Sequence, residues 1–406
     1  MVAFYLLVSV MPFIRHPLWS ELIGDVTLVK YVGMICLGYA LLRMAAIGSR
    51  PHFFATWQSR WFIIFAALGM ASFLALGIPQ PFEVSPFMSL ASFLLFFFVT
   101  LVVVDSTLHL RLTLLVAVGS VAYASLHVLR EWQKYGGMSF GFRPGWVSGD
   151  PNYFSVSALL CLPVAFYLLG TRQARWERSF CIASLVVMLV ALTLAASRGA
   201  LLGIVAGSLL MVWRSPRRLR SLLLVGSVLL PLMLLTPASP LDRLLHPTHS
   251  DQESSDIRTI LWDAGLNMIS EHPLRGIGAG NFKHLVKRFT TEDIEFIAHN
   301  TYVELGAELG LPGLLLFLAV LFATFRTLRQ VQRDPSSSLL VRQASLGLEA
   351  GLLTTAVALF FVSAYYQKLL WLFIFLSMCL PSLREQSSDA GAGLPAPERS
   401  TSLDVS

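Results

Sequence analysis

Long stretches without a charged side chain constrain this sequence more than any other feature. Ser85–Val104 contains no Asp, Glu, Lys or Arg, and Leu112–Leu129 and Ser221–Thr236 are equally free of these residues. The hydrocarbon core of a bilayer is about 30 Å thick, and a helix needs about 20 apolar residues to cross it. Only 13% of the chain is charged, against about 25% in typical soluble domains. The sequence therefore predicts a polytopic membrane protein and excludes an ordinary soluble domain.

The apolar runs predict an all-α integral membrane protein with about twelve transmembrane helices. The first is short, and we interpret it as a retained span because it has neither a basic leader nor a clear cleavage site. The region 179–213 is short for two crossings. The predicted spans are Met1–Phe13, Val26–Leu42, Trp61–Ile78, Ser85–Val104, Leu112–Leu129, Tyr153–Leu169, Ser179–Ala196, Gly199–Trp213, Ser221–Thr236, Thr301–Phe325, Leu346–Ser363 and Leu369–Leu380.

The basic residues predict the orientation of these spans. The net charge is +6, and most Lys and Arg fall in alternate connections, which the positive-inside rule assigns to the cytoplasm. Both termini are then cytoplasmic, and the long polar connection 238–300 is on the outer face. Within that loop a surface helix is predicted over Ile257–Ile269. Its apolar residues at helical spacing are Ile257, Ile260, Leu261, Ala264 and Met268.

No stretch of the sequence predicts a metal or a cofactor. The four cysteines all fall inside apolar runs, where structural thiols are the simplest interpretation. The glycines of 276–280 imitate a nucleotide-binding loop, but the full GxGxxG pattern and a preceding strand are missing. We therefore expect neither dinucleotide binding nor a metal site.

Four arginines lie on the side where the positive-inside rule expects few. Arg198 is the most informative, because it sits between two apolar runs, in the stretch Ala-Ala-Ser-Arg-Gly-Ala at 195–200. A cation at the centre of a span costs about 2.5–3.5 kcal/mol on insertion scales and usually marks function. A single arginine could equally reach out to lipid headgroups. Together the four favour an anion site: Arg143, Arg198, Arg258 and Arg275.

Two helix starts on the same side carry further candidate residues. Asp150 and Asn152 flank a proline, so they are either a helix cap or a site for phosphate or sugar hydroxyls. His299 precedes the span that begins near Thr301. An imidazole there is either an interfacial residue with an ordinary hydrogen bond or a base near neutral pH.

These pieces together resemble the O-antigen ligase family of integral membrane glycosyltransferases. The most specific piece is His299-Asn300, followed nine residues later by Gly310-Leu311-Pro312-Gly313, which fits the H[NSQ]-x9-GxxG pattern of the ligases. The resemblance covers Gly141–Thr327. The other stretches that carry the resemblance are Arg143-Pro144, Gly149-Asp150-Pro151-Asn152, Ser197-Arg198-Gly199, Arg258-Thr259-Ile260-Leu261-Trp262, His272-Pro273-Leu274-Arg275-Gly276-Ile277-Gly278 and Ala298-His299-Asn300-Thr301-Tyr302.

The resemblance implies a domain organisation. Transmembrane helices occupy 1–140, the ligase-like domain with periplasmic loop 238–300 occupies 141–327, and C-terminal transmembrane helices occupy 328–384. The composition of 385–406, rich in Ser, Ala, Gly and Pro, predicts a disordered cytoplasmic tail.

The resemblance also implies the reaction. A glycan is carried on undecaprenyl pyrophosphate, and an acceptor hydroxyl, with lipid A-core favoured, displaces the lipid at the periplasmic face of the bacterial inner membrane. The transfer would be inverting and independent of metals and cofactors, with no nucleic-acid partner. Alternatives are a polymerase or a protein O-oligosaccharyltransferase of the same family, or a transporter of lipid-linked glycans. The implied catalytic residues are His299, Arg198 and Arg258, and the implied substrate-binding residues are Arg143, Asp150, Asn152, Arg275, Asn300 and Tyr302.

Overall fold

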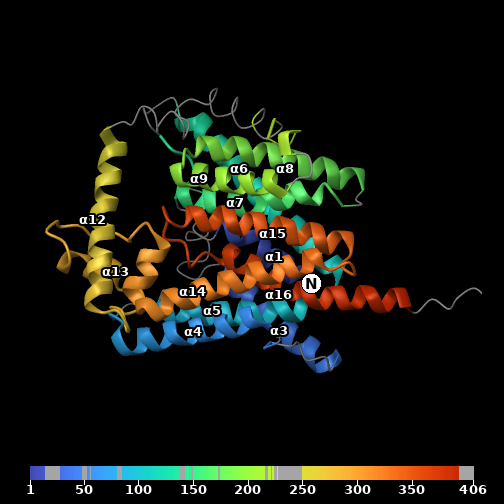
Figure 1. Cartoon of the computed structure of the whole chain (residues 1–406), viewed down its shortest axis with the longest axis horizontal. Helices are drawn as coiled ribbons and strands as arrows, with labels where there is room; N and C mark the ends of the chain where they lie inside the picture. The colour runs from blue at the N-terminus through green and yellow to red at the C-terminus, as the bar shows by residue number, and fades with distance from the viewer. Residues whose placement is uncertain are drawn as a thin grey trace, which may run out of the picture.

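The computed structural model describes most of the chain, and every element in the described part is helical. The described residues are 1–13, 28–47, 53–54, 56–79, 85–136, 142–145, 147, 150–171, 174–214, 218–220, 222–223, 226 and 249–392. Most helices lie lengthwise, side by side in a bundle, while α12 lies across one end of it (Figure 1). The helices are α1 (Val2–Val10), η1 (Met11–Phe13), α3 (Leu28–Ile47), α4 (Trp57–Leu76), α5 (Pro86–Val103), α6 (Thr107–Tyr135), α7 (Pro151–Leu168), α8 (Arg175–Leu194), α9 (Arg198–Arg214), α12 (His249–Glu271), α13 (Phe282–Leu285), η4 (Val286–Arg288), α14 (Thr301–Arg333), α15 (Leu339–Ala358) and α16 (Lys368–Ala392).

Seven helices of the described residues are long and apolar enough to cross a membrane: α3, α4, α5, α6, α7, α8 and α14. Two shorter apolar stretches are Val2–Phe13 and Lys368–Leu383. Helix α9 has 17 residues, and the predicted span Ser221–Thr236 lies almost entirely outside the described residues. The prediction of a multi-pass helical membrane protein is confirmed, whereas the count of twelve spans and the periplasmic placement of the loop are not.

Several predicted boundaries differ from the structure, and two of the differences change what a segment is. The span expected at Leu346–Ser363 is α15, which starts and ends earlier, so 359–367 connects two helices instead. The predicted tail begins inside α16, which continues to Ala392, and the remaining residues 393–406 lie outside the described part.

Polar side chains define where several helices begin. A Ser, Thr, Asp or Asn at the N-cap accepts a hydrogen bond from an amide of the first turn, which would otherwise have no partner. Pro follows the cap in α5 and α7, where its missing N–H costs nothing. The caps are Thr56, Ser85, Ser106, Asp150, Asn300 and Ser338.

Small residues let α15 pack closely between α7 and α9. A Cβ added to Gly351 would lie 2.5 Å from the carbonyl oxygen of Leu160 in α7. A Cβ added to Gly203 in α9 would lie 2.5 Å from the carbonyl oxygen of Thr354 in α15. Close backbone approach through glycine is how membrane helices gain packing energy without a hydrophobic driving force. This packing fixes the ends of α7, α9 and α15 relative to one another.

Helix α14 is interrupted at Gly310, whose backbone angles are φ 69° and ψ −178°. In an unbroken helix the amide of residue 311 would bond to the carbonyl of Ala307, and that of residue 312 to the carbonyl of Glu308. Pro312 has no N–H, so the Glu308 carbonyl cannot have its helical partner. The break therefore leaves two carbonyl groups that need other donors.

The loop after α12 supplies those donors. The amide of Ile277 bonds to the Ala307 carbonyl at 2.9 Å, and the amide of Gly278 bonds to the Glu308 carbonyl at 3.0 Å. In return the amide of residue 311 donates to the carbonyl of Pro273 at 2.7 Å. The glycine-rich stretch 276–280, which imitates a nucleotide loop in the sequence, is thus a clamp on the break in α14.

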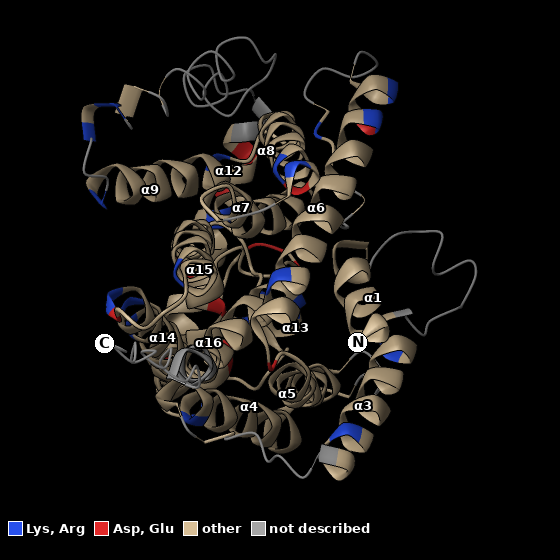
Figure 2. Cartoon of the chain, turned by 90° about the vertical axis from the view of Figure 1, so that its right-hand side faces the viewer, with Lys and Arg blue, Asp and Glu red and all other residues tan. Residues whose placement is uncertain are grey.

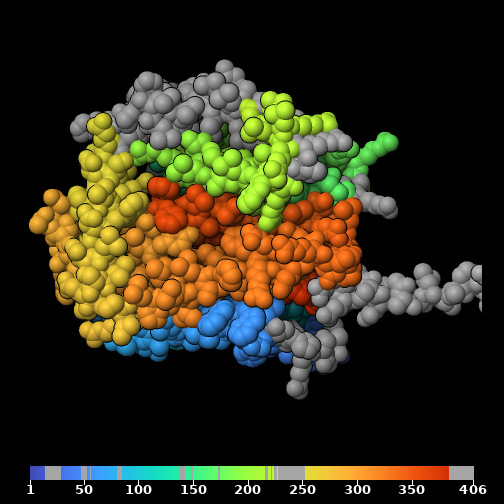
Figure 3. Space-filling view, viewed as in Figure 1, coloured from blue at the N-terminus to red at the C-terminus, as the bar shows by residue number. Residues whose placement is uncertain are grey.

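Helix α12 packs on this clamp by one apolar face. Leu261, Ala264 and Met268 are buried and form a second core with Phe282 and Val286. The predicted helix Ile257–Ile269 is therefore confirmed as a helix, but it is longer than expected and its apolar face packs on protein. Figure 3 shows α12 and the neighbouring part of the chain closing one end of the bundle.

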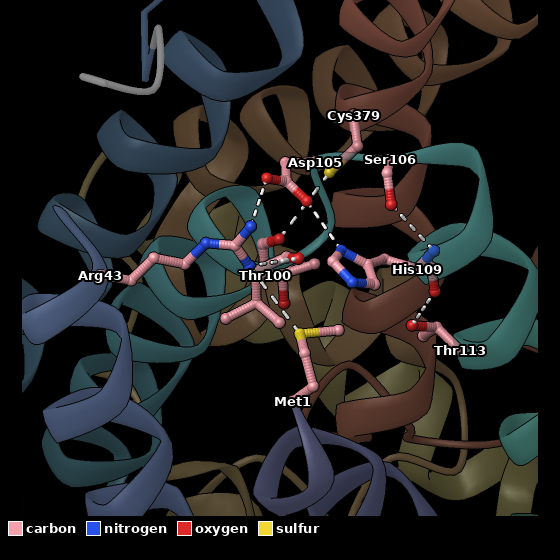
Figure 4. Close-up of polar contacts among 9 residues, drawn as sticks. Met1, Arg43, Thr100, Asp105, Ser106, His109, Thr113 and Cys379 are labelled. Carbon is pink, nitrogen blue, oxygen red and sulfur yellow. Dashed lines mark hydrogen bonds and ion pairs between the residues drawn. The ribbon is translucent and has the colours of Figure 1, made fainter. Parts of the chain in front are cut away.

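The opposite end of the bundle carries many of the basic residues (Figure 2). There Arg43 of α3 forms an ion pair with Asp105, which lies between α5 and α6. Asp105 also contacts the Nδ1 atom of His109 at 2.7 Å. Figure 4 shows Asp105 between the side chains of Arg43 and His109, with Met1 beside Arg43. This network ties the N-terminal helices to the α5–α6 corner.

Candidate functional site

Three of the predicted arginines come together from three separate elements. Arg143 lies in the segment before α7, Arg198 is the first residue of α9, and Arg258 lies on α12. Burial, together with the charges of Arg198 and Arg143, lowers the pKa of Arg258 to about 10, while the charge of Asp150 opposes this shift. A guanidinium loses affinity for its proton when cations crowd it in a poorly solvated place. The three arginines therefore concentrate positive charge at the end of the bundle where α12 lies.

Arg143 is held by the corner between α8 and α9. Its Nε donates to the carbonyl oxygen of Ala195 at 3.0 Å, and its Nη2 donates to Oδ1 of Asn152 at 3.1 Å. The same Asn152 oxygen accepts a hydrogen bond from the Ser197 hydroxyl at 3.0 Å. Asn152 therefore joins Arg143 to the residue directly before Arg198.

Arg198 connects α9 to α12. Its Nη2 atom lies 3.2 Å from the hydroxyl oxygen of Ser255, which is three residues before Arg258 on α12. Residues three and four apart lie on one face of a helix. Ser255 and Arg258 therefore lie on the same side of α12, and the contact draws Arg258 towards Arg198.

His299 stands at the start of α14 in a left-handed backbone conformation, with φ 50°. The preceding residue, Ala298, is held on both sides. Its amide donates to the Glu304 carboxylate at 3.1 Å, and its carbonyl accepts from the indole nitrogen of Trp262 at 3.0 Å. A left-handed non-glycine residue is uncommon and persists where neighbouring contacts determine it. These contacts fix the direction in which the imidazole leaves the chain.

The electrostatic surroundings of His299 favour its neutral form. Burial lowers the pKa of His299 below its ordinary value, the nearby charge of Arg258 lowers it further, and Asp150 raises it in part. An imidazole must be neutral to accept a proton. His299 is thus half-buried, close to an arginine cluster, and suited to act as a base at neutral pH.

Asp150 belongs to this cluster and also caps α7. Its Oδ1 accepts from the amides of Asn152 at 2.6 Å and Tyr153 at 3.3 Å. Its charge acts on Arg143, Arg258 and His299. The helix-cap interpretation of Asp150 is therefore confirmed, and its carboxylate also counters part of the positive charge. Binding of phosphate or sugar hydroxyls there stays a prediction.

Asn300 and Tyr302 make structural contacts. The Asn300 side chain caps α14, accepting from the amides of Tyr302 and Val303 at 3.0 and 3.2 Å, and it is buried. The Tyr302 hydroxyl donates to the carbonyl of Ala356 in α15 at 2.7 Å. Thr301 between them donates to the carbonyl of Val362. These contacts anchor the start of α14, and with it His299, to the end of α15.

Arg275 does not join the cluster. It is exposed, beyond the C-terminal end of α12, on the loop that clamps α14. From Arg258 to the end of α12 at Glu271 the helix rises about 20 Å, at about 1.5 Å per residue. Arg275 instead lines a separate cavity of about 170 Å³ with Leu76, His272, Gly276, Ile277, Leu285, Arg288 and Phe289. The structure thus groups Arg143, Arg198 and Arg258, with His299 close to Arg258, and places Arg275 elsewhere.

Two buried glutamates support the site and were not predicted from the sequence as its residues. Glu304 accepts from the Ala298 amide and from the Ser363 hydroxyl. Glu308 accepts from the Phe282 amide at 3.1 Å and the Tyr365 hydroxyl at 2.6 Å. Two acids four residues apart in an otherwise apolar helix are costly unless they are satisfied, and that cost was the signal available in the sequence. Within the described residues, no three His, Cys, Asp or Glu side chains are grouped as metal ligands would be.

Part of the chain that carries these residues matches a known protein family. Residues 183–318 match the family model described as O-antigen ligase. The matched segment includes Arg198, Arg258 and His299, whereas Arg143 and Asp150 precede it. No curated protein matches the chain.

Proposed function

We propose that this chain, which carries a domain of the O-antigen ligase family, transfers a glycan from undecaprenyl pyrophosphate to an acceptor hydroxyl. The observation that carries the proposal is the grouping of Arg143, Arg198 and Arg258, with His299 close to Arg258. Lipid A-core is the acceptor we favour. The active site faces the periplasm, in a protein of the bacterial inner membrane with both termini in the cytoplasm.

The arginines serve the leaving group in this proposal. A pyrophosphate gains negative charge as its bond to the sugar breaks, and guanidinium groups bind such oxygens in pairs of parallel hydrogen bonds. Charge that is already in position stabilises the transition state without reorganisation. Arg198 and Arg258 hold the pyrophosphate, and Arg143 adds charge while it fixes the α8–α9 corner. The arginines thereby do what a divalent metal does in many other transferases, so the reaction needs neither metal nor cofactor.

His299 serves the acceptor. Its neutral imidazole takes the proton from the acceptor hydroxyl as that oxygen attacks the anomeric carbon of the donor sugar. The bond between that carbon and the phosphate oxygen breaks, and undecaprenyl pyrophosphate leaves with the electron pair. A single displacement of this kind inverts the configuration of the anomeric carbon. The imidazolium then returns its proton to solvent.

Four further residues act on the substrates indirectly, by positioning the arginines and His299. They are Asn152, Asp150, Asn300 and Tyr302. Asn152 orients Arg143, Asp150 tempers the charge of the cluster, and Asn300 and Tyr302 anchor the helix behind His299. Arg275 lies too far along the α12 side to share the pyrophosphate.

Reconstitution tests the proposal. The purified chain is mixed with an undecaprenyl-pyrophosphate glycan and lipid A-core, with and without EDTA, and the products are separated by mass. Glycan-bearing lipid A-core, together with free undecaprenyl pyrophosphate in both conditions, supports the proposal. Elongated undecaprenyl-linked glycan would identify a polymerase, and loss of activity in EDTA with rescue by Mg²⁺ would refute the metal-free mechanism. Movement of intact donor across vesicles without transfer would identify a transporter.

A further inference from the structure

A cavity of about 430 Å³ lies near the end of the bundle opposite His299. It is formed by the last turns of α14 together with parts of α9 and α15, and basic residues cluster at these helix ends (Figure 2). Its lining residues divide into an apolar group and a charged or polar group. They are Leu210, Phe322, Phe325 and Leu353, and Arg326, Arg329, Gln330, Arg333 and Glu349.

The two groups follow one another along a single stripe of α14. Phe322 and Phe325 come first, and Arg326, Arg329 and Arg333 follow at spacings of three or four residues. Residues at this spacing occupy one face of a helix. The wall of the cavity thus changes from apolar to cationic over about three turns, in the direction of the helix end.

A buried carboxylate gives the cavity a fixed inner wall. Glu349 is 1% exposed and accepts hydrogen bonds from Arg214, from Nε of Arg329 at 3.0 Å and from Nε2 of Gln332 at 2.7 Å. Its single negative charge cannot balance the surrounding arginines. Among the described residues, Arg326 and Arg333 form no ion pair, so the outer part of the cavity keeps positive charge that an anion would neutralise.

We propose that this cavity binds an anionic phospholipid of the surrounding bilayer. The phosphate lies against Arg326 and Arg333, and an acyl chain runs down the apolar wall of Phe322 and Phe325. Basic pockets between transmembrane helices bind acidic headgroups in this way, and each arginine near such a surface adds to the attraction. This site is independent of the glycan-transfer site and does not rest on the proposed function.

Features of the rim favour a lipid over a free anion. Phe322, which lines the cavity, is 69% exposed. Trp213 does not line it but is 70% exposed and precedes Arg214, which donates to the lining residue Glu349. Tryptophan is enriched at the level of lipid headgroups, so its position next to the arginines marks the boundary between hydrocarbon and water. A free phosphate would leave the apolar half of the cavity unused.

Thermal unfolding in detergent tests the proposal with defined probes. The purified full chain is titrated with short-chain phosphatidylglycerol, with phosphatidylcholine of the same chain length, and with inorganic phosphate. We expect a saturable rise in Tm with phosphatidylglycerol alone. The double variant Arg326→Gln, Arg333→Gln should bind this lipid roughly tenfold more weakly or worse, because two attractive charges are lost.

Arg60→Gln is the matched control. Arg60 lies on α4 and is also a surface arginine, but it does not line the cavity. This variant should bind phosphatidylglycerol as the unmodified chain does. An equal response to phosphatidylcholine, a double variant that binds normally, or an Arg60 variant that is weakened as much would each overturn the proposal. Stabilisation by inorganic phosphate equal to that by the lipid would replace it with a simple anion site.

Discussion

The indole nitrogen of Trp262 lies 3.0 Å from the carbonyl oxygen of Ala298 and donates a hydrogen bond to it. Trp262 is four residues after Arg258 on α12, so the two share a face of the helix. Ala298 is the residue before His299. This one contact therefore sets the distance between the arginine on α12 and the imidazole at the start of α14. In the fold the indole of Trp262 therefore contacts the segment that carries His299.

Trp262→Phe should reduce turnover without unfolding the chain. The substitution keeps an aromatic ring but removes the donor, so α12 loses its link to the turn that carries His299. We expect kcat to fall about tenfold, on the order of one lost hydrogen bond, with little change in Tm. Steady-state transfer kinetics and a melting curve check this. Unchanged kcat with normal Tm would show that the contact does not position the site.

Asp150→Asn should shift the pH profile of transfer. The carboxylate raises the pKa of His299, although burial and Arg258 lower it more. Without that charge the pKa of His299 falls further, and the imidazole stays neutral to lower pH. The acid limb of kcat/KM should therefore move to lower pH, while Asn preserves the helix cap.

Arg258→Gln should move the acid limb of the kcat/KM profile in the opposite direction, to higher pH. Removing this cation raises the pKa of His299, so the residual activity should decline at a higher pH than in the unmodified chain. If the acid limb stays fixed in both the Asp150 and Arg258 variants, it does not report His299.

Arg198→Lys and Arg258→Lys should each lose much of the activity while inserting normally into membranes. An ammonium is a point charge and cannot make the planar two-bond contact of a guanidinium. Loss of one charge-stabilising donor typically costs about 10²–10³ in kcat. Turnover of both Lys variants close to that of the unmodified chain would remove the pyrophosphate clamp from the mechanism.

Gly310→Ala should destabilise the chain. Gly310 has φ 69°, and an added Cβ would lie 2.8 Å from the carbonyl carbon and oxygen of Leu274. We expect a loss of about 1–3 kcal/mol from backbone strain, with a further cost from displacing the clamp. Gly33→Ala is the control, since Gly33 lies in α3 and its Cβ would meet nothing within 4 Å. Equal Tm values for the two variants would contradict the assigned role of the clamp.

The helices and part of the site follow from local patterns in the sequence. Apolar runs and caps such as Ser85 and Asp150 predict helix starts because the determining contacts lie within one turn. The grouping of Arg143, Arg198 and Arg258 was expected because the positive-inside rule predicts few basic residues on the side to which it assigns all three.

The rest depends on contacts between distant segments. The break at Gly310 is stable because Ile277 and Gly278 supply its missing donors, and no local pattern shows that those segments meet. In the sequence Arg275 cannot be told apart from Arg258, because both are arginines of the predicted loop 238–300. Only the length and direction of α12 show that Arg275 lies away from the cluster. The full extent of α12, and the burial of its apolar face, likewise come from packing on α14.

The rate of transfer by His299 variants tests the central claim most directly. Donor binding and turnover are measured side by side for His299→Ala and His299→Gln, with melting curves as the folding control. A general base contributes typically about 10²–10⁴-fold to rate, so both variants should lose turnover on that scale while donor binding, which depends on the arginines and the lipid, changes little. Turnover of His299→Gln equal to that of the unmodified chain would show that His299 is structural and that the proposed base is wrong.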